Sequence, residues 1–586
     1  QKLCKKDGSE VIYPKMPLPK EQKWGEHMWS HNYRDTNRIN CYDTGTSPCK
    51  TACPAHIAVQ GYLKLAKEGR YEDALALIKK DNPLPAICGR ICNRRCEDAC
   101  TRATIDEAVA IDAVKRFVAE RDLKAETRYI PKPVVPSLKG GFEEKIAIIG
   151  AGPAGLSCAY FLAQKGYRPV IFEKSPRPGG MLTYGIPSYK LEKNLIEAEI
   201  EVIRAMGVEI RCGVEVGKDI TIGQLREQGY KGFYIAIGCQ QGRKPGIPGE
   251  DARGVHTAVD FLREAGEKER FDLGGEVIVI GGGNVAVDAA RVSTRCTAGR
   301  VSMFCLESRD EMPASREEIL EASEENIAIN NGWGPKEILT ENGRAVGVVF
   351  RKCVRVFDEN HRFAPVYDEE DVMTVPCSDV IFSVGQGVFW GDLLKESKVA
   401  LRSNSGVLAD RLTFQTAEPD IFVGGDVFTG PKFAIDAIAA GREGAVSLHR
   451  YVQEHCTLTI GRNRRDFIEL DKEDLFIAGY DNTDRQRPEK AEESQLRSFR
   501  DLSHTLTEEQ VKAETSRCLG CGASVVDPNK CIGCGICTTK CVFDAISLHR
   551  ELPGCSEMVK SEDKLKYVLP NMVRQSLKIR FAPKKD

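Results

Sequence analysis

The chain has 586 residues, of which 42% are hydrophobic and 29% are charged, and it contains 53 glycines and 23 cysteines. This length and composition predict a soluble protein of several domains. The 83 basic and 85 acidic residues give a formal net charge of −2, which excludes a global basic field that would recruit nucleic acid or an anionic membrane.

The cysteines are concentrated in two groups, with seven in residues 41–100 and six in residues 518–541. A secreted disulfide scaffold is short and spreads its cysteines along the chain, so these clustered thiols predict metal ligands. The longest uncharged stretch, residues 146–163, is interrupted by three glycines and a proline, which predicts a strand, a turn and a helix rather than a membrane span. We therefore expect a cytoplasmic protein.

In chain order, the sequence predicts an N-terminal arm, a helical iron–sulfur domain, an α/β region and a cysteine-rich module. Helical spacing of apolar residues appears over 57–80 and 105–120, and alternating strands and helices extend to residue 450. The charged linker contains a basic run of three arginines that we expect to face solvent, Arg462, Arg464 and Arg465. The predicted parts are 1–40 (arm), 41–130 (helical iron–sulfur domain), 141–275 and 386–455 (FAD-binding domain), 276–385 (NAD(P)-binding domain), 456–515 (charged linker) and 516–586 (4Fe–4S ferredoxin-like α+β module and tail).

Two glycine-rich turns predict two Rossmann-like dinucleotide sites. Gly150–Gly155 has the GxGxxG pattern after an apolar strand and before a helix, and the next strand ends in Glu173, an acid placed to accept ribose hydroxyls. Gly281–Ala286 has the GxGxxA form in the same context. A purely structural turn is the alternative at each place. Two such sites in one chain suggest that one binds a flavin and the other a nicotinamide dinucleotide.

The segment Ile421–Asp426 assigns the flavin to the first site. It is a strand that ends in an acid and precedes a Gly/Ala-rich helix over 433–448. In two-dinucleotide flavoproteins this acid contacts the ribityl chain and the helix N-terminus faces the flavin ring. Cys158 and Cys239 have no second cysteine beside them, so the redox pair of a disulfide reductase is missing from the sequence. Hydride transfer to a flavin needs alignment rather than an acid or base, and we name no catalytic residue.

The C-terminal cysteine run has the C-x2-C-x2-C-x3-C spacing of bacterial ferredoxins, which predicts a 4Fe–4S cluster, with zinc as the alternative. Its members are Cys531, Cys534, Cys537 and Cys541. Upstream, Cys518 and Cys521 resemble the remains of a partner motif, and we predict that they hold a second cluster of this module, completed by Cys555 or a non-cysteine ligand. In the N-terminal group, where Cys88 is a further thiol, the predicted ligands of one or two clusters are Cys41, Cys49, Cys53, Cys92, Cys96 and Cys100.

The ordered motifs resemble the glutamate synthase small (beta) subunit family, over residues 35–450. The motifs are Cys53-Pro54, Cys88–Cys92, Gly150–Gly155, Gly179–Pro187, Gly281–Asp288, Glu311–Ala314 and Gly424–Asp426. That family includes the flavin large subunit of NADH-dependent ferredoxin:NADP oxidoreductase and the N-terminal half of dihydropyrimidine dehydrogenase; the C-terminal module here is an addition. The resemblance implies that NAD(P)H gives a hydride to FAD, and that electrons pass singly to two to four 4Fe–4S clusters.

The motifs and the resemblance together give a set of cofactor-binding residues. For FAD these are Gly150, Gly152, Pro153, Ala154, Gly155, Glu173, Lys174, Gly180, Met181, Ile186, Asp426 and Ala434. For the nicotinamide dinucleotide they are Gly281, Gly283, Asn284, Val285, Glu307, Ser308 and Arg309.

The chain departs from the family at three places. Arg38 stands where another cysteine often precedes the first cluster motif, and Lys115 stands near the family's Gln or Glu iron ligand, where a protonated lysine cannot bind iron. NADP-using members carry Tyr-Arg-Arg after the second nucleotide strand, whereas this chain has Glu307 there. A carboxylate repels a 2′-phosphate and hydrogen-bonds a bare 2′-hydroxyl, which favours NAD(H). Arg309 and Arg316 leave NADP(H) open.

The sequence therefore predicts an iron–sulfur flavoprotein oxidoreductase subunit. We expect it to exchange hydride with NAD(P)H and to relay single electrons to or from a partner subunit that carries iron–sulfur or flavin groups. Ferredoxin is a candidate partner, and electron bifurcation a candidate context. The alternatives are a glutamate synthase small-subunit-type electron donor, a stand-alone NAD(P)H reductase, and a non-catalytic electron-wire subunit.

Overall fold

The computed structural model divides the chain into two compact units, residues 1–523 and 524–586. It describes residues 47–135, 140–297, 299–395, 397–453, 456–459, 462, 472, 477, 480–489, 498–501, 504–521, 532–540, 546, 548 and 561–580. Among these residues, no helix is both long and apolar enough to cross a membrane.

The N-terminal part of the first unit is a group of short helices. They are α3 (Pro48–Ala52), α4 (Val59–Lys67), α5 (Tyr71–Lys79), α6 (Pro85–Ile91), α7 (Arg95–Asp98), a 3-10 helix (Thr101–Thr104) and α8 (Ile111–Leu123). Proline opens α3 and α6, where its fixed φ suits the first turn. The predicted helix over 57–80 is two helices, because Gly69 adopts a φ of +75° that ends the first of them. The helix predicted from residue 105 begins at Ile111.

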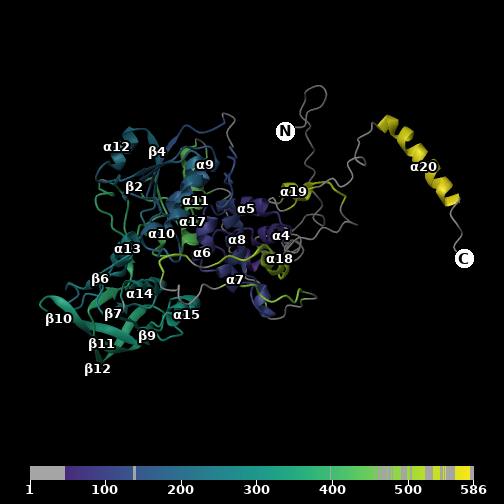
Figure 1. Cartoon of the computed structure of the whole chain (residues 1–586). Coiled ribbons are helices and arrows are strands. Elements are labelled where there is room, and N and C mark those ends of the chain that lie inside the picture. The colour runs from purple at the N-terminus through teal and green to yellow at the C-terminus, as the bar shows by residue number, and fades with distance from the viewer. Residues whose placement is uncertain are drawn as a thin grey trace, which may run out of the picture. The chain divides into compact units, whose positions relative to one another are not determined.

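A late segment of the chain completes this helical domain. Helix α18 (Glu508–Ser516), opened by a capping box between Thr507 and Gln510, packs against α4 and α8 (Figure 1). The segment predicted to be a charged linker is therefore structured here. Arg462 is also buried: its guanidinium donates to the Leu412 carbonyl at 2.7 Å and to Ser447 Oγ at 3.1 Å, so the predicted solvent-facing role is wrong for it. Arg464 and Arg465 lie outside the described residues.

The first α/β layer is a sheet of five parallel strands in the order β15-β4-β1-β2-β3. The strands are β1 (Lys145–Ile149), β2 (Val170–Glu173), β3 (Glu209–Cys212), β4 (Tyr230–Ile235) and β15 (Ile421–Val423). The helices are α9 (Pro153–Gln164), α10 (Met181–Tyr184), α11 (Lys193–Ala205), α12 (Ile222–Glu227), α16 (Asp426–Thr429) and α17 (Ala434–Val452). Side chains alternate along β1, so that Ile146 and Ile148 join one core and Ala147 and Ile149 the other.

The second α/β layer is a parallel sheet in the order β6-β13-β7-β8-β9. Its strands are β6 (Val255–Thr257), β7 (Glu276–Ile280), β8 (Arg300–Cys305), β9 (Ala328–Asn331) and β13 (Asp379–Phe382), with helices α13 (Ala258–Lys268), α14 (Asn284–Cys296) and α15 (Arg316–Glu324). An antiparallel sheet of β10 (Trp333–Glu341), β11 (Arg344–Phe357) and β12 (Phe363–Pro376) lies beside it. The parallel sheet of this second layer includes β6, which lies upstream of the predicted domain boundary at residue 276.

The chain passes between the two layers twice, through β5 (Gln241–Gly242) and β14 (Gln386–Gly387), which pair antiparallel. The first crossing follows β4 and the second follows β13. In the second unit the described helices are α19 (Ile536–Lys540) and α20 (Lys564–Arg580), preceded by a 3-10 turn (Ser561–Asp563). The helical N-terminal domain and the two Rossmann-like α/β domains of the predicted fold class are confirmed.

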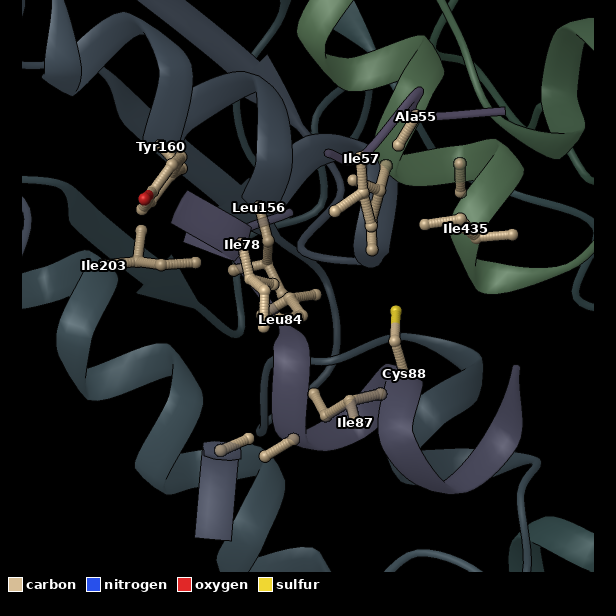
Figure 2. Close-up of a cluster of buried hydrophobic side chains, with 14 of the residues drawn as sticks. Ala55, Ile57, Ile78, Leu84, Ile87, Cys88, Leu156, Tyr160, Ile203 and Ile435 are labelled. Carbon is tan, nitrogen blue, oxygen red and sulfur yellow. The ribbon is translucent and has the colours of Figure 1, made fainter. Parts of the chain in front are cut away.

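One apolar core joins the helical domain to the first layer. Figure 2 shows Ile78 and Leu84 of the helical domain beside Leu156 of α9, with Ile435 of α17 in the same group. The buried Tyr160 hydroxyl donates to the Lys79 carbonyl at 2.7 Å. Because this core is continuous, the helical domain is held in a fixed position against α9 and α17.

Candidate functional site

The first glycine-rich turn has the strand–turn–helix form that the sequence predicts. Gly150 has a φ of +104°, and a Cβ atom on it would lie 2.5 Å from the Ala236 carbonyl oxygen. A Cβ atom on Gly155 would lie 2.0 Å from the Gly150 carbonyl oxygen, so this glycine allows α9 to pack closely on β1. Gly152 is different: a Cβ atom there would meet nothing within 4 Å, because the residue borders an open cavity.

Glu173 ends β2 beside this turn. Its carboxylate accepts hydrogen bonds from the backbone N–H groups of Ala151, at 2.7 Å, and Ser175, at 2.8 Å. The side chain is buried and lines the cavity. Each carboxylate oxygen has a second lone pair, so Glu173 retains acceptor capacity for a bound hydroxyl group.

The loop before α10 closes over the same turn. Gly180 has a φ of +55°, and its missing Cβ atom would lie 2.9 Å from the Gly152 Cα atom, so only glycine fits this close approach. Four residues of this region that the sequence predicts to contact FAD line the cavity: Lys174, Gly180, Met181 and Ile186.

Asp426 also lines the cavity, at the start of α16. Burial raises the pKa of its carboxyl to about 6, and the carboxyl accepts the Lys432 N–H at 3.2 Å. The N-terminus of α17 follows at Ala434, which also lines the cavity. Gly441 lets α17 approach α9, since a Cβ atom there would lie 2.3 Å from the Ala154 carbonyl oxygen.

The second glycine-rich turn repeats this geometry between β7 and α14. Gly281 has a φ of +147°, and its missing Cβ atom would lie 2.5 Å from the Ser383 carbonyl oxygen. Gly283 opens α14 and borders open space, as Gly152 does. Glu307 follows β8 and lies beside the turn, where its Oε2 atom would be 2.7 Å from a Cβ atom on Gly282. Burial raises the pKa of Glu307.

The cavity has a volume of about 1250 Å³, above the ~300–1,000 Å³ typical of drug-sized ligands, which suits an extended dinucleotide. Of the predicted FAD residues, all line it except Gly155, which supports packing instead. Asn284 and Val285 line it from the second layer, whereas Gly281, Gly283, Glu307, Ser308 and Arg309 lie outside it.

The sequence did not predict that the helical domain would form part of this wall. Cys92, Asn93 and Arg94 line the cavity together with Gly152 and Asp426. Arg95, next in the chain, forms a bidentate ion pair with Asp436 of α17, at 3.0 and 3.1 Å. These contacts join segments far apart in the sequence, so local patterns carry no sign of them.

The described cysteines of the helical domain form two groups. The thiol of Cys49 interacts electrostatically with those of Cys100, Cys518 and Cys521. In the other group Cys92 has Cys53, Cys88 and Cys96 as neighbours. Cys41 lies outside the described residues.

Lys115 is buried beside the second group and pairs with Asp112. Although burial lowers it, the carboxylate of Asp112 holds the pKa of Lys115 well above its usual value. The lysine therefore stays protonated and does not offer a lone pair to iron, as the sequence analysis expects.

In the second unit, Cys534 and Cys537 are exposed at the start of α19, while Cys531 and Cys541 lie outside the described residues. Among the described residues, no three His, Cys, Asp or Glu side chains converge on one metal ion. A 4Fe–4S cluster binds each thiolate through a different iron atom, so the spread thiols fit a cluster better than a single ion. The acceptors, helix N-termini and space-bordering glycines around the cavity likewise fit FAD.

Three family models match the chain. Residues 144–441 match the pyridine nucleotide-disulphide oxidoreductase model. Residues 27–127 match dihydropyrimidine dehydrogenase domain II with its 4Fe-4S cluster, and residues 524–547 match a 4Fe-4S binding domain. Neither iron–sulfur model includes Cys518 or Cys521.

Three curated relatives are similar to this chain over longer spans. The NADP(+)-dependent formate dehydrogenase subunit beta of Moorella thermoacetica is 34% identical over 81% of this chain and 70% of its own length. The glutamate synthase [NADPH] small chain of Escherichia coli K12 is 34% identical over 70% of this chain and 90% of its own. The NAD-dependent dihydropyrimidine dehydrogenase subunit PreT of Escherichia coli O157:H7 is 32% identical, over 71% and 93%.

Proposed function

We propose a specific electron route for this chain, which belongs to the pyridine nucleotide-disulphide oxidoreductase family and, within it, to the group that contains the glutamate synthase small chains. The chain is an iron–sulfur flavoprotein oxidoreductase. In the proposed route a reduced nicotinamide dinucleotide delivers a hydride at the cavity, and single electrons leave through the cysteine groups to a partner subunit. FAD, when bound, supplies the conversion from two-electron to one-electron chemistry.

The observation that carries this proposal is the shared wall of the cavity. Cys92 lines the same space as Gly152 and Asp426. A cluster held by Cys92 would therefore border the flavin site without intervening protein layers. The ion pair between Arg95 and Asp436 and the continuous core fix this juxtaposition, which electron transfer over a short distance requires.

The chain's own residues bind and orient the cofactor in this scheme. The remaining lone pairs of the Glu173 carboxylate would accept hydrogen bonds from the ribose hydroxyl groups. Gly152 and the N-terminus of α9 would offer backbone N–H groups to the pyrophosphate, and Asp426 would accept hydrogen bonds from the ribityl chain. The N-terminus of α17 favours negative charge beside it, because its N–H groups lack partners within the helix.

We propose NADH as the electron donor. The carboxylate of Glu307 stands after β8, beside Gly282, where a bare ribose 2′-hydroxyl would donate to it and a 2′-phosphate would be repelled. Two of the relatives above are named for NADP(+) or NADPH and one for NAD. Steady-state kcat/KM values for NADH and NADPH test the proposal, and a tenfold preference of the wild type for NADPH would contradict it.

A partner subunit is the proposed electron acceptor, because two of these relatives are named as subunits and a third as a small chain. Anaerobic co-purification identifies the partner. Electron bifurcation and a ferredoxin partner stay predictions. Adding ferredoxin as a second electron acceptor would test them.

The route itself is tested by Cys92→Ser. We expect NADH to bleach the flavin in both the wild type and the variant under anaerobic conditions, and the electron paramagnetic resonance (EPR) signals of reduced clusters to develop slowly or not at all in the variant. Cys456→Ser, at an exposed cysteine, is the matched control. Cluster reduction at the wild-type rate in Cys92→Ser would refute the route.

A further inference from the structure

Two cysteines that the sequence assigns to the C-terminal module lie elsewhere in the structure. Cys518 and Cys521 follow α18, inside the first compact unit, and Cys518 packs against the core that contains Cys49. The Gln60 side-chain amide donates a hydrogen bond to the Cys521 carbonyl oxygen. Gln60 belongs to α4, so the pair lies against the N-terminal helices, more than 400 residues earlier in the chain.

A buried charge network fixes this placement. Arg517, directly before Cys518, is fully buried and donates to the Glu514 carboxylate at 2.7 Å and to the Glu107 carbonyl at 2.7 Å. Glu514 is also fully buried and accepts the Ala110 N–H at 2.8 Å. A buried charge is costly unless its hydrogen bonds are satisfied, so these partners determine where Cys518 lies.

The helical domain supplies the second half of the network. The Arg102 guanidinium donates to the Asp106 carboxylate at 2.7 Å and to the Arg517 carbonyl at 3.4 Å. Arg517 in turn donates to Asp106 at 3.0 Å. Arg102 lies two residues after Cys100, so one network holds the chain on both sides of the thiols.

The four thiols come from segments that pack together. Cys49 lies on α3, which contacts α4 and α7, Cys100 follows α7, and Cys518 packs against the same core as both. The hydrogen bond from Gln60 of α4 places Cys521 beside them. Cys49 is buried and the other three cysteines are half-buried. Four thiols with no histidine among them match the ligand set of an iron–sulfur cluster.

We propose that Cys49, Cys100, Cys518 and Cys521 together bind one 4Fe–4S cluster, which ties the segment after α18 to the N-terminal helices. This inference rests on the proposed function in that it assumes iron–sulfur clusters in the helical domain.

The test is iron counting in double variants of the full chain, purified anaerobically and normalised to FAD. Cys49→Ser and Cys521→Ser should each lose one cluster, ~4 iron atoms, and the double variant should also lose only ~4, because both residues bind the same cluster. Cys521→Ser combined with Cys534→Ser should lose ~8, because Cys534 serves another cluster. Cys456→Ser should lose none.

The opposite pattern would overturn the proposal. If the double variant Cys49→Ser/Cys521→Ser loses ~8 iron atoms, then Cys521 belongs to the C-terminal cluster. The same conclusion follows if the double variant Cys521→Ser/Cys534→Ser loses only ~4. The proposal would also be overturned if the wild type contained zinc in place of iron at this site and the zinc were lost in Cys521→Ser. The proposed function is read separately, from flavin bleaching by NADH in the wild type, which does not depend on which thiols bind the iron.

A second measurement on the wild type avoids variants that fail to fold. Iodoacetamide labelling, read by mass spectrometry, should modify Cys518 and Cys521 only after a chelator has removed iron, and Cys456 both before and after. Labelling of Cys521 in the iron-loaded protein, at the rate of Cys456, would overturn the proposal.

Discussion

Gly152 and Gly155 lie three residues apart in one turn, and the structure predicts opposite consequences for replacing each with alanine. At Gly155 the new Cβ atom would lie 2.0 Å from the Gly150 carbonyl oxygen, a backbone atom that cannot move aside. We expect overpacking to destabilise the flavin-free protein by about 1–3 kcal/mol. At Gly152 the φ of −76° suits alanine, and the new methyl group would meet no protein atom within 4 Å.

The stability cost at Gly152 should therefore be small. Alanine restricts the unfolded chain, which stabilises the fold by about 0.4–1 kcal/mol, while loss of glycine at a helix N-cap costs about 0.5–1 kcal/mol. These effects offset each other to within ~0.5 kcal/mol. The methyl group would instead occupy the path of the pyrophosphate, so FAD affinity should fall at least about tenfold, or 1.4 kcal/mol.

Urea unfolding of the flavin-free proteins and FAD titration measure the two quantities separately. The expected result is loss of stability in Gly155→Ala and loss of affinity without loss of stability in Gly152→Ala. Gly152→Ala with wild-type FAD affinity would refute the assignment of this turn to the pyrophosphate.

Three further predictions follow from other parts of the site. Glu307→Arg should raise kcat/KM for NADPH relative to NADH at least tenfold, because the carboxylate that repels a 2′-phosphate becomes a cation; an unchanged ratio would show that Glu307 does not contact the ribose. Burial raises the pKa of Asp426 to about 6, so ionisation of this carboxyl opposes folding. Between pH 4 and 8 the flavin-free wild type should therefore lose ~1–3 kcal/mol of stability that Asp426→Asn retains. Parallel stability profiles of the two proteins against pH would contradict this. Arg517→Gln leaves Glu514 buried without its cation and should cost about 3–5 kcal/mol in urea unfolding; a cost below about 1 kcal/mol would mean that the network does not hold the segment after α18.

The glycine-rich turns were predictable because their signal is local. The turn at Gly150–Gly155 needs a strand before it, a helix after it and an acid at the end of the next strand, and all of these lie within 30 residues of sequence. The structure has each element in place, with Glu173 beside Ala151. Asp426 was predicted from a similar local pattern, in which a short apolar strand ends in an acid and a helix follows.

The position of Cys518 and Cys521 was not predictable in this way. Their nearest cysteines in sequence are those of the ferredoxin run, and proximity in sequence favoured one module. The interactions that place them, from Arg517 to Glu107 and from Gln60 to Cys521, join residues about 400 or more positions apart. Charged residues such as Arg462 and Arg517 also resemble a solvated surface in sequence, and only the partners supplied by the fold show that they are buried.

An anaerobic titration of the full chain with NADH tests the central claim most directly. FAD alone accepts the two electrons of one NADH. If the flavin passes electrons to clusters in the same chain, more than one NADH per FAD should be consumed, and the EPR signals of reduced 4Fe–4S clusters should grow as the flavin absorbance falls. Bleaching that stops at one NADH per FAD with no cluster signal, or no bleaching at all, would contradict the account.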